Sequence, residues 1–214
     1  MTHGVGSFRE LHLGRVLSTD DPERRGRIEV EMAATGLRLW APCLTLGAGN
    51  GYGVSMLPRT DEIVALAFAG PDEDNAIVLG AVWSGDSAHP EAARLVDDVY
   101  AIVTPAGVKV KIDDGNGPRV DIETPSGAHL TVTDDGGGEI TLERGGESIS
   151  MTASTISIVS SATVEVQATQ VDVSAAMVNV DAAMSQFSGV VKCDTLIATS
   201  VVGTSYTPGA GNVW

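Results

Sequence analysis

The side chains that most often carry out chemistry are scattered along this chain of 214 residues. Serine is common, but the sequence contains no Gly-x-Ser-x-Gly elbow that would expose a nucleophile. The four histidines show no metal-ligand spacing; they are His3, His12, His89 and His129. Carboxylates occur as neighbouring pairs in turns, which favours solvated corners over calcium contacts; they are Asp20-Asp21, Asp97-Asp98, Asp113-Asp114 and Asp134-Asp135. We therefore predict no catalytic residue, no metal site and no cofactor.

Binding chemistry is also sparse. The glycine-rich stretch Gly47–Gly53 lacks the Lys-Ser/Thr ending and the following helix of a phosphate loop, so we interpret it as a flexible or partner-docking loop. Cys43 and Cys193 give no disulfide framework, and we expect both to be reduced in a protein made in the cytosol. The net charge of -15 argues against a nucleic-acid partner, because phosphate binding needs clustered cations.

Five short alternating segments occupy the first 84 residues and are separated by turn-rich breaks. Such a series of short strands without a convincing helix predicts a small all-β barrel of the OB type. The segments are Leu13–Leu17, Gly26–Met32, Leu37–Leu44, Ile63–Phe68 and Ala76–Val82.

The second half carries pairs of apolar residues, each split by one polar residue and repeated every seven or eight positions. Members of a pair are two apart, which is strand alternation and not the heptad of a coiled coil. A strand with two inward side chains must stack on copies of itself to form a core. Either three chains wind around a common axis, or one chain makes coils of three strands; the pairs alone leave both open. They are Ile149/Met151, Ile156/Ile158, Val164/Val166, Val171/Val173 and Val178/Val180.

A twenty-residue repeat precedes these pairs. Thr104-Pro105-Ala106-Gly107 is followed by an alternating run and an Asp-Asp pair, and Thr124-Pro125-Ser126-Gly127 begins a similar series. Thr-Pro-x-Gly predicts a tight turn, and the alternation after it predicts a strand.

A series of short motifs runs through the N-terminal half in a fixed order. They are Gly14-Arg15-Val16, Asp21-Pro22, Gly26–Val30, Trp40-Ala41-Pro42, Gly53, Pro58, Asp61–Val64, Phe68 with Gly70-Pro71, and Ala76–Trp83. Their order resembles the OB domain of phage baseplate spike proteins of the baseplate assembly protein V type. It also resembles relatives in contractile injection systems, including the valine-glycine repeat proteins of type VI secretion. The Thr-Pro-x-Gly repeats resemble the start of the trimeric β-helix in the same family.

The resemblance implies an OB barrel followed by an intertwined trimeric β-helix needle. The expected divisions are a lead-in over 1–12, the barrel over 13–84, a linker over 85–99, the β-helix over 100–196 and a tip segment over 197–214. The ten paired residues given above, from Ile149 to Val180, would form the needle core. The implied function is that of a homotrimeric, non-enzymatic central spike, which transmits the force of contraction and touches the target membrane only transiently.

The resemblance also implies partners. The barrels would attach to a baseplate hub protein, and the particle would be assembled in the cytoplasm into a phage tail or tail-like baseplate. Some family spikes bind iron through a C-terminal His-x-His, but no histidine follows His129 here. A PAAR-repeat tip protein is therefore expected to cap the end near Tyr206, Val213 and Trp214.

The residues also allow comparison with two other classes of protein. A monomeric OB domain with a single-chain solenoid would be a binding module. A solenoid glycan hydrolase would need clustered Asp or Glu on one face, and that clustering is missing.

Overall fold

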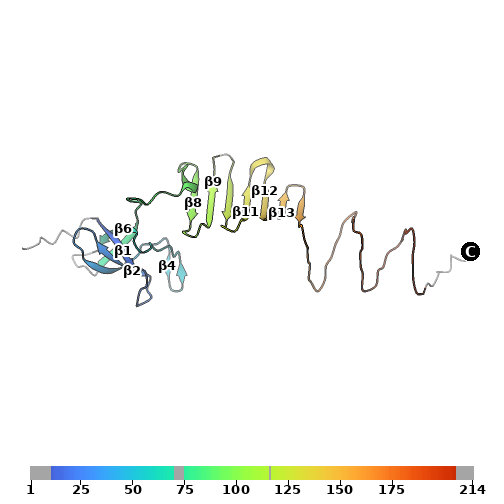
Figure 1. Cartoon of the computed structure of the whole chain (residues 1–214), viewed down its shortest axis with the longest axis horizontal. Helices are drawn as coiled ribbons and strands as arrows, with labels where there is room; N and C mark the ends of the chain where they lie inside the picture. The colour runs from blue at the N-terminus through green and yellow to red at the C-terminus, as the bar shows by residue number, and fades with distance from the viewer. Residues whose placement is uncertain (1–10, 70–74, 116, 206–214) are drawn as a thin grey trace, which may run out of the picture. The chain divides into compact units, whose positions relative to one another are not determined.

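The computed structural model describes residues 11–69, 75–115 and 117–205, and these residues are predominantly β-structure (Figure 1). Two single 3-10 turns lie wholly within these ranges, η2 (Glu91–Ala93) and η3 (Asp135–Gly137). None of the helices in these ranges is long and apolar enough to cross a bilayer. The fold is thus all-β, as predicted.

A five-stranded antiparallel sheet near the N-terminus has the strand order β3-β2-β1-β6-β7. A parallel bridge between Cys43 and Val78, with a 2.8 Å hydrogen bond from Leu44 N to Val78 O, joins the end of β3 to β7. The two outer strands are therefore linked and the sheet closes into an OB-type barrel. The strands are β1 (His12–Ser18), β2 (Arg27–Met32), β3 (Arg38–Pro42), β6 (Ile63–Phe68) and β7 (Ala76–Ala81). All five predicted barrel strands are present.

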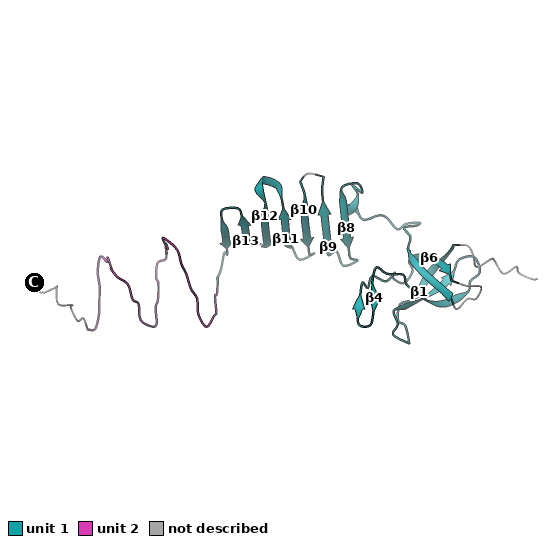
Figure 2. Cartoon of the chain, turned by 180° about the vertical axis from the view of Figure 1, so that it is seen from behind, with its two compact units in different colours: residues 1–164 teal, residues 165–214 magenta. Residues whose placement is uncertain are grey.

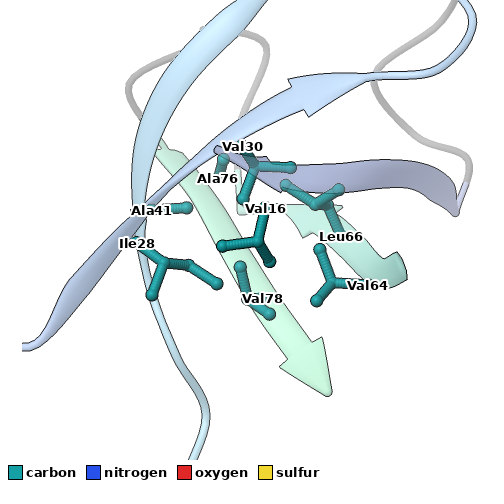
Figure 3. Close-up of a cluster of buried hydrophobic side chains, with 8 residues drawn as sticks. All are labelled: Val16, Ile28, Val30, Ala41, Val64, Leu66, Ala76 and Val78. Atoms are coloured by element: carbon teal, nitrogen blue, oxygen red, sulfur yellow. The ribbon is translucent and has the colours of Figure 1, made fainter. Parts of the chain in front are cut away.

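Alternation along these strands builds the barrel core. In β2, Ile28, Val30 and Met32 are buried while the residues between them are half-buried, as expected when successive side chains point to opposite faces. Side chains from all five strands meet inside the barrel (Figure 3). The cluster consists of Val16, Ile28, Val30, Ala41, Val64, Leu66, Ala76 and Val78.

Asp21 organises the connection between β1 and β2. Its side chain is buried and accepts hydrogen bonds from the backbone N–H groups of Glu23 at 3.0 Å and Arg25 at 2.7 Å. Arg27 Nη2 donates to Asp21 Oδ1 at 2.8 Å, and the Arg27 guanidinium lies over the ring of Trp40. The Arg27 hydrogen bond holds the pKa of Asp21 well below its usual range.

The predicted docking loop contains a small hairpin of β4 (Ala48–Gly49) and β5 (Tyr52–Gly53), which the sequence did not predict. Val54 N donates to Gly47 O at 3.0 Å and closes its open end.

A second sheet contains seven antiparallel strands in sequence order, β8 to β14 (Figure 1). Each strand pairs only with its neighbours in the chain, so the sheet is a meander. The strands are β8 (Val99–Val103), β9 (Lys109–Asp113), β10 (Arg119–Glu123), β11 (Ala128–Thr133), β12 (Glu139–Arg144), β13 (Glu147–Thr152) and β14 (Ile156–Val159).

Between Val99 and Val159 the meander differs from the β-helix repeat of seven or eight residues expected for this part of the chain. Strands begin about ten residues apart instead of seven or eight, and each pairs within its own chain. The turns explain the difference. Gly107 N donates to Thr104 O at 2.8 Å and Gly127 N to Thr124 O at 2.9 Å, so the Thr-Pro-x-Gly segments reverse the chain. Both glycines have positive φ, which side-chain-bearing residues rarely adopt.

The chain divides into two compact units, residues 1–164 and residues 165–214 (Figure 2). In the second unit, residues 165–205 are exposed throughout and carry no assigned strand or helix. Within a single chain this segment buries no apolar core that could offset the entropy lost on ordering it.

Candidate functional site

One face of the meander is built from two ladders of apolar side chains that cross all seven strands. In the first ladder Ile122 pairs with Val110 on one side and Leu130 on the other, and Leu142 pairs with Ile149. In full it contains Ile102, Val110, Ile122, Leu130, Leu142, Ile149 and Ile158. The second contains Tyr100, Ile112, Val120, Val132, Ile140, Met151 and Ile156. We call these residues the apolar face.

The chain that carries the apolar face does not cover it. Val120 and Ile122 in the middle of the sheet remain 37% exposed, and Ile156 near its end is 67% exposed. In a monomer, twelve of these large side chains would be exposed to water. A contiguous surface of this kind marks an interface.

The opposite face of the meander is polar. Asp121 lies at the centre of three strands, where Arg119 binds it through Nε at 2.9 Å and Nη2 at 2.7 Å. His129 Nε2 and Thr131 Oγ1 lie 3.3 Å and 3.2 Å from Asp121 Oδ1. Burial raises the pKa of Asp121, but the hydrogen bonds led by Arg119 outweigh it and leave this pKa below its usual value.

Further charge pairs extend this polar network within β9 and from β9 to β10. Lys111 Nζ lies 2.9 Å from Asp113 Oδ2, and this hydrogen bond lowers the pKa of Asp113. Lys109 pairs with Glu123 across β9 and β10 at 3.1 Å. Partly exposed pairs contribute little stability each. Their main consequence is to distinguish a solvent face from the apolar face.

The end of the meander is held by Glu147. Its carboxylate accepts hydrogen bonds from Ser161 N at 2.9 Å and from Ser161 Oγ, and the Ser161 side chain lowers its pKa. The chain leaving β14 is thereby anchored beside β13. A cleft of about 610 Å³ forms there, and its apolar lining includes Leu142, Ile149, Ile158 and Val164.

Comparison with protein families assigns both parts of the chain. Residues 12–83 match the type VI secretion system/phage-baseplate injector OB domain. Residues 119–183 match the phage baseplate V C-terminal trimerisation domain, which covers β10 to β14 and part of the extended chain. The chain belongs to the phage baseplate spike family. A comparison with curated proteins returned no match.

Membership of the spike family explains the uncovered apolar face. The trimerisation match supports a homotrimer, and the family supports a structural role in a phage or type VI secretion baseplate. A trimer would bring two further copies of the same surface, with side chains of identical chemistry, to each chain.

The structure places the ten predicted needle-core residues in two settings. Four of them, Ile149, Met151, Ile156 and Ile158, lie on the apolar face, where β13 pairs with β14. The other six lie in the extended chain and are all exposed: Val164, Val166, Val171, Val173, Val178 and Val180. Their burial at a common axis stays a prediction. The predicted tip residues Tyr206, Val213 and Trp214 lie outside the described residues.

Sequence reasoning missed the upstream part of the apolar face, from Tyr100 to Leu142. The signal was present in the alternation after each Thr-Pro-x-Gly turn, as in Val108-Lys109-Val110-Lys111-Ile112. The alternation predicted a strand correctly, but strand pairing was needed to show that these residues continue the face of Ile149 and Met151.

Two of the acidic pairs considered for chemistry are brought side by side, since Asp114 N donates to Asp98 O at 2.9 Å. No group of three or more His, Cys, Asp or Glu in the described parts of the chain could hold a metal ion. Cys43 is half-buried beside β7, and burial raises the pKa of its thiol, whereas Cys193 is exposed. Among the acidic pairs, Asp113 Oδ1 accepts from Gly115 N at 3.0 Å, which is a turn contact.

Proposed function

We propose that the chain is the homotrimeric central spike of a contractile tail or injection-system baseplate. In this proposal the apolar faces of three meanders meet at a common axis, and residues 160–196 of the three chains intertwine below them. The observation that supports it is the pair of uncovered apolar ladders, most of which lie inside the region matched by the trimerisation domain.

Rigidity is the property that such a spike requires. Packing three sheets face to face around an axis buries the apolar face, so the needle resists bending under load. The proposed role is to transmit the thrust of contraction to a small area of the target envelope. The barrels would attach to a hub protein, and a PAAR-repeat tip protein would cap the other end near Tyr206, Val213 and Trp214. We further propose assembly in the cytoplasm and only transient contact with the target membrane.

Light scattering of the purified full-length chain tests the proposal. The chain mass is 22.1 kDa, and we expect a particle of three times that mass. Interlocked chains also unfold slowly, so a trimer band should persist on an unheated SDS gel and disappear on boiling. A particle with the mass of one chain would overturn the spike and favour a monomeric binding module. Electron microscopy of the trimer should show a threefold needle.

A further inference from the structure

The segment between β3 and β6 is an exposed apolar arm, which we define as residues 44–56. Leu46 is 97% exposed and Tyr52 77% exposed, and Leu44, Val54 and Met56 are exposed as well. The arm is attached to the barrel at both ends: Leu44 N donates to Val78 O at 2.8 Å, and Leu57, the next residue after the arm, packs against the core. Its position is therefore fixed at the base while its apolar side chains face water.

The arm has little to hold its shape within one chain. Its strands β4 and β5 contain two residues each, and an isolated hairpin of this size is marginal in water. Its main internal contacts outside the strand pairing are the hydrogen bonds from Val54 N to Gly47 O and from Thr45 Oγ1 to Val54 O, and the Tyr52 ring lying against Gly49. Five exposed apolar side chains on a weak hairpin indicate a surface that is covered in the working assembly.

The charge pattern indicates what covers it. The chain has a net charge of -15, yet no charged residue occurs between Cys43 and Leu57. Around a threefold axis each side chain lies near its own copies, so any charge there would face a like charge. The apolar face of the meander has the same property, since none of its residues is charged. A different protein would instead be recognised by an acidic chain through complementary charge, which the arm does not offer.

We propose that the arms of three copies pack against one another and join the barrels of the trimer. This inference rests on the proposed trimeric spike and adds to it a second contact between copies, separate from the meander. Because the trimerisation domain holds the three arms at high effective concentration, a contact too weak to associate free chains is sufficient.

Thiol crosslinking of the full-length chain tests the contact. Asn50→Cys at the arm tip is made with Cys43→Ala and Cys193→Ala, and the product is treated with a short bismaleimide and boiled in SDS. We expect covalent dimers containing up to two of every three chains, because three thiols can pair only once. The matched control is Thr35→Cys, an exposed residue in the turn between β2 and β3, which should stay monomeric on the boiled gel.

Adding Leu46→Asp to the Asn50→Cys chain separates the arm contact from trimerisation. The crosslinked fraction should fall about tenfold while light scattering still reports a trimer. Two outcomes would overturn the arm contact alone. One is equal crosslinking at positions 50 and 35. The other is a crosslinking yield that falls on dilution, because that is the behaviour of contacts between separate trimers. A monomeric mass overturns the spike and the arm contact together.

Discussion

Leu142 and Ile149 lie directly opposite each other on the antiparallel strands β12 and β13, yet they remain 49% and 45% exposed. The β12–β13 turn brings them together, and their strands are fully paired in this region. The backbones of these two strands are therefore fully paired within one chain, whereas their apolar side chains remain partly exposed.

Replacing Ile149 with Asp should prevent trimer formation. The carboxylate would enter a dry interface at three equivalent positions, and each copy would also lose the roughly 1.5–3 kcal/mol gained by burying an isoleucine. The matched control is Ser150→Asp, which adds the same charge one residue later on the polar face. Light scattering should give the mass of one chain for the first variant and of three for the second. Equal behaviour of both would contradict the assignment of the faces.

Shortening Leu66 to Ala should destabilise the barrel by about 2–5 kcal/mol, since its side chain is fully buried in the core. Leu79→Ala serves as control, because Leu79 lies on β7 and is 43% exposed. Hydrogen exchange of barrel amides in the full-length protein measures the difference. The trimer mass should be the same for both variants, because neither position lies on the meander.

Gly14→Ala should cost about 1–3 kcal/mol through overpacking. A Cβ at this position would overlap Val30 Cγ1 and lie 3.0 Å from both Glu31 O and Leu66 Cδ1. Gly47→Ala is the matched control, since a Cβ there meets no atom within 4 Å. The melting temperature of the barrel should fall only for the first variant. An equal fall in both would contradict the overpacking account, because Gly→Ala at an open position lowers the entropy of the unfolded chain and should not destabilise the fold.

Asp21→Asn should destabilise the barrel at pH 7 by removing the charged partner of Arg27. The pKa of Asp21 is lowered in the folded state, so its stabilising effect is fully present above the pKa of an unfolded Asp, about 3.9. It is lost as the pH falls through the folded pKa. Thermal unfolding should therefore show a gap between wild type and variant that is constant from pH 7 to about pH 5 and shrinks at pH 3. Asp20→Asn, an exposed neighbour, should show no such gap.

The barrel was predictable because its segments are short, regular and local. Alternation in residues such as Ile28, Val30 and Met32 fixes which side chains enter the core, and the turns limit the possible pairings. Gly14 illustrates the limit of this reasoning. In the sequence it is recognisable only as part of a motif. The structure shows why the position needs a glycine: a Cβ there would collide with Val30 and Leu66.

The meander was predicted less well because its apolar face is not covered within one chain. The spacing of Val164, Val171 and Val178 suggested a single period for the whole second half, whereas hairpins set a longer one between Val99 and Val159. Apolar alternation identifies a strand that needs a partner, but it does not identify the partner. The match to the trimerisation domain supports a homotrimer, which the apolar pattern alone left open.

The Thr-Pro-x-Gly turns have a consequence for how long such a protein can be. From Thr104 to Glu123 the chain makes two strands and two reversals, and from Thr124 it makes the same structure again. Duplicating or deleting one twenty-residue unit would change the sheet by two strands, roughly 10 Å, and would leave every later side chain on its original side. The length of the sheet can therefore be changed, in evolution or by engineering, in fixed increments that leave the pattern of the apolar face unaltered.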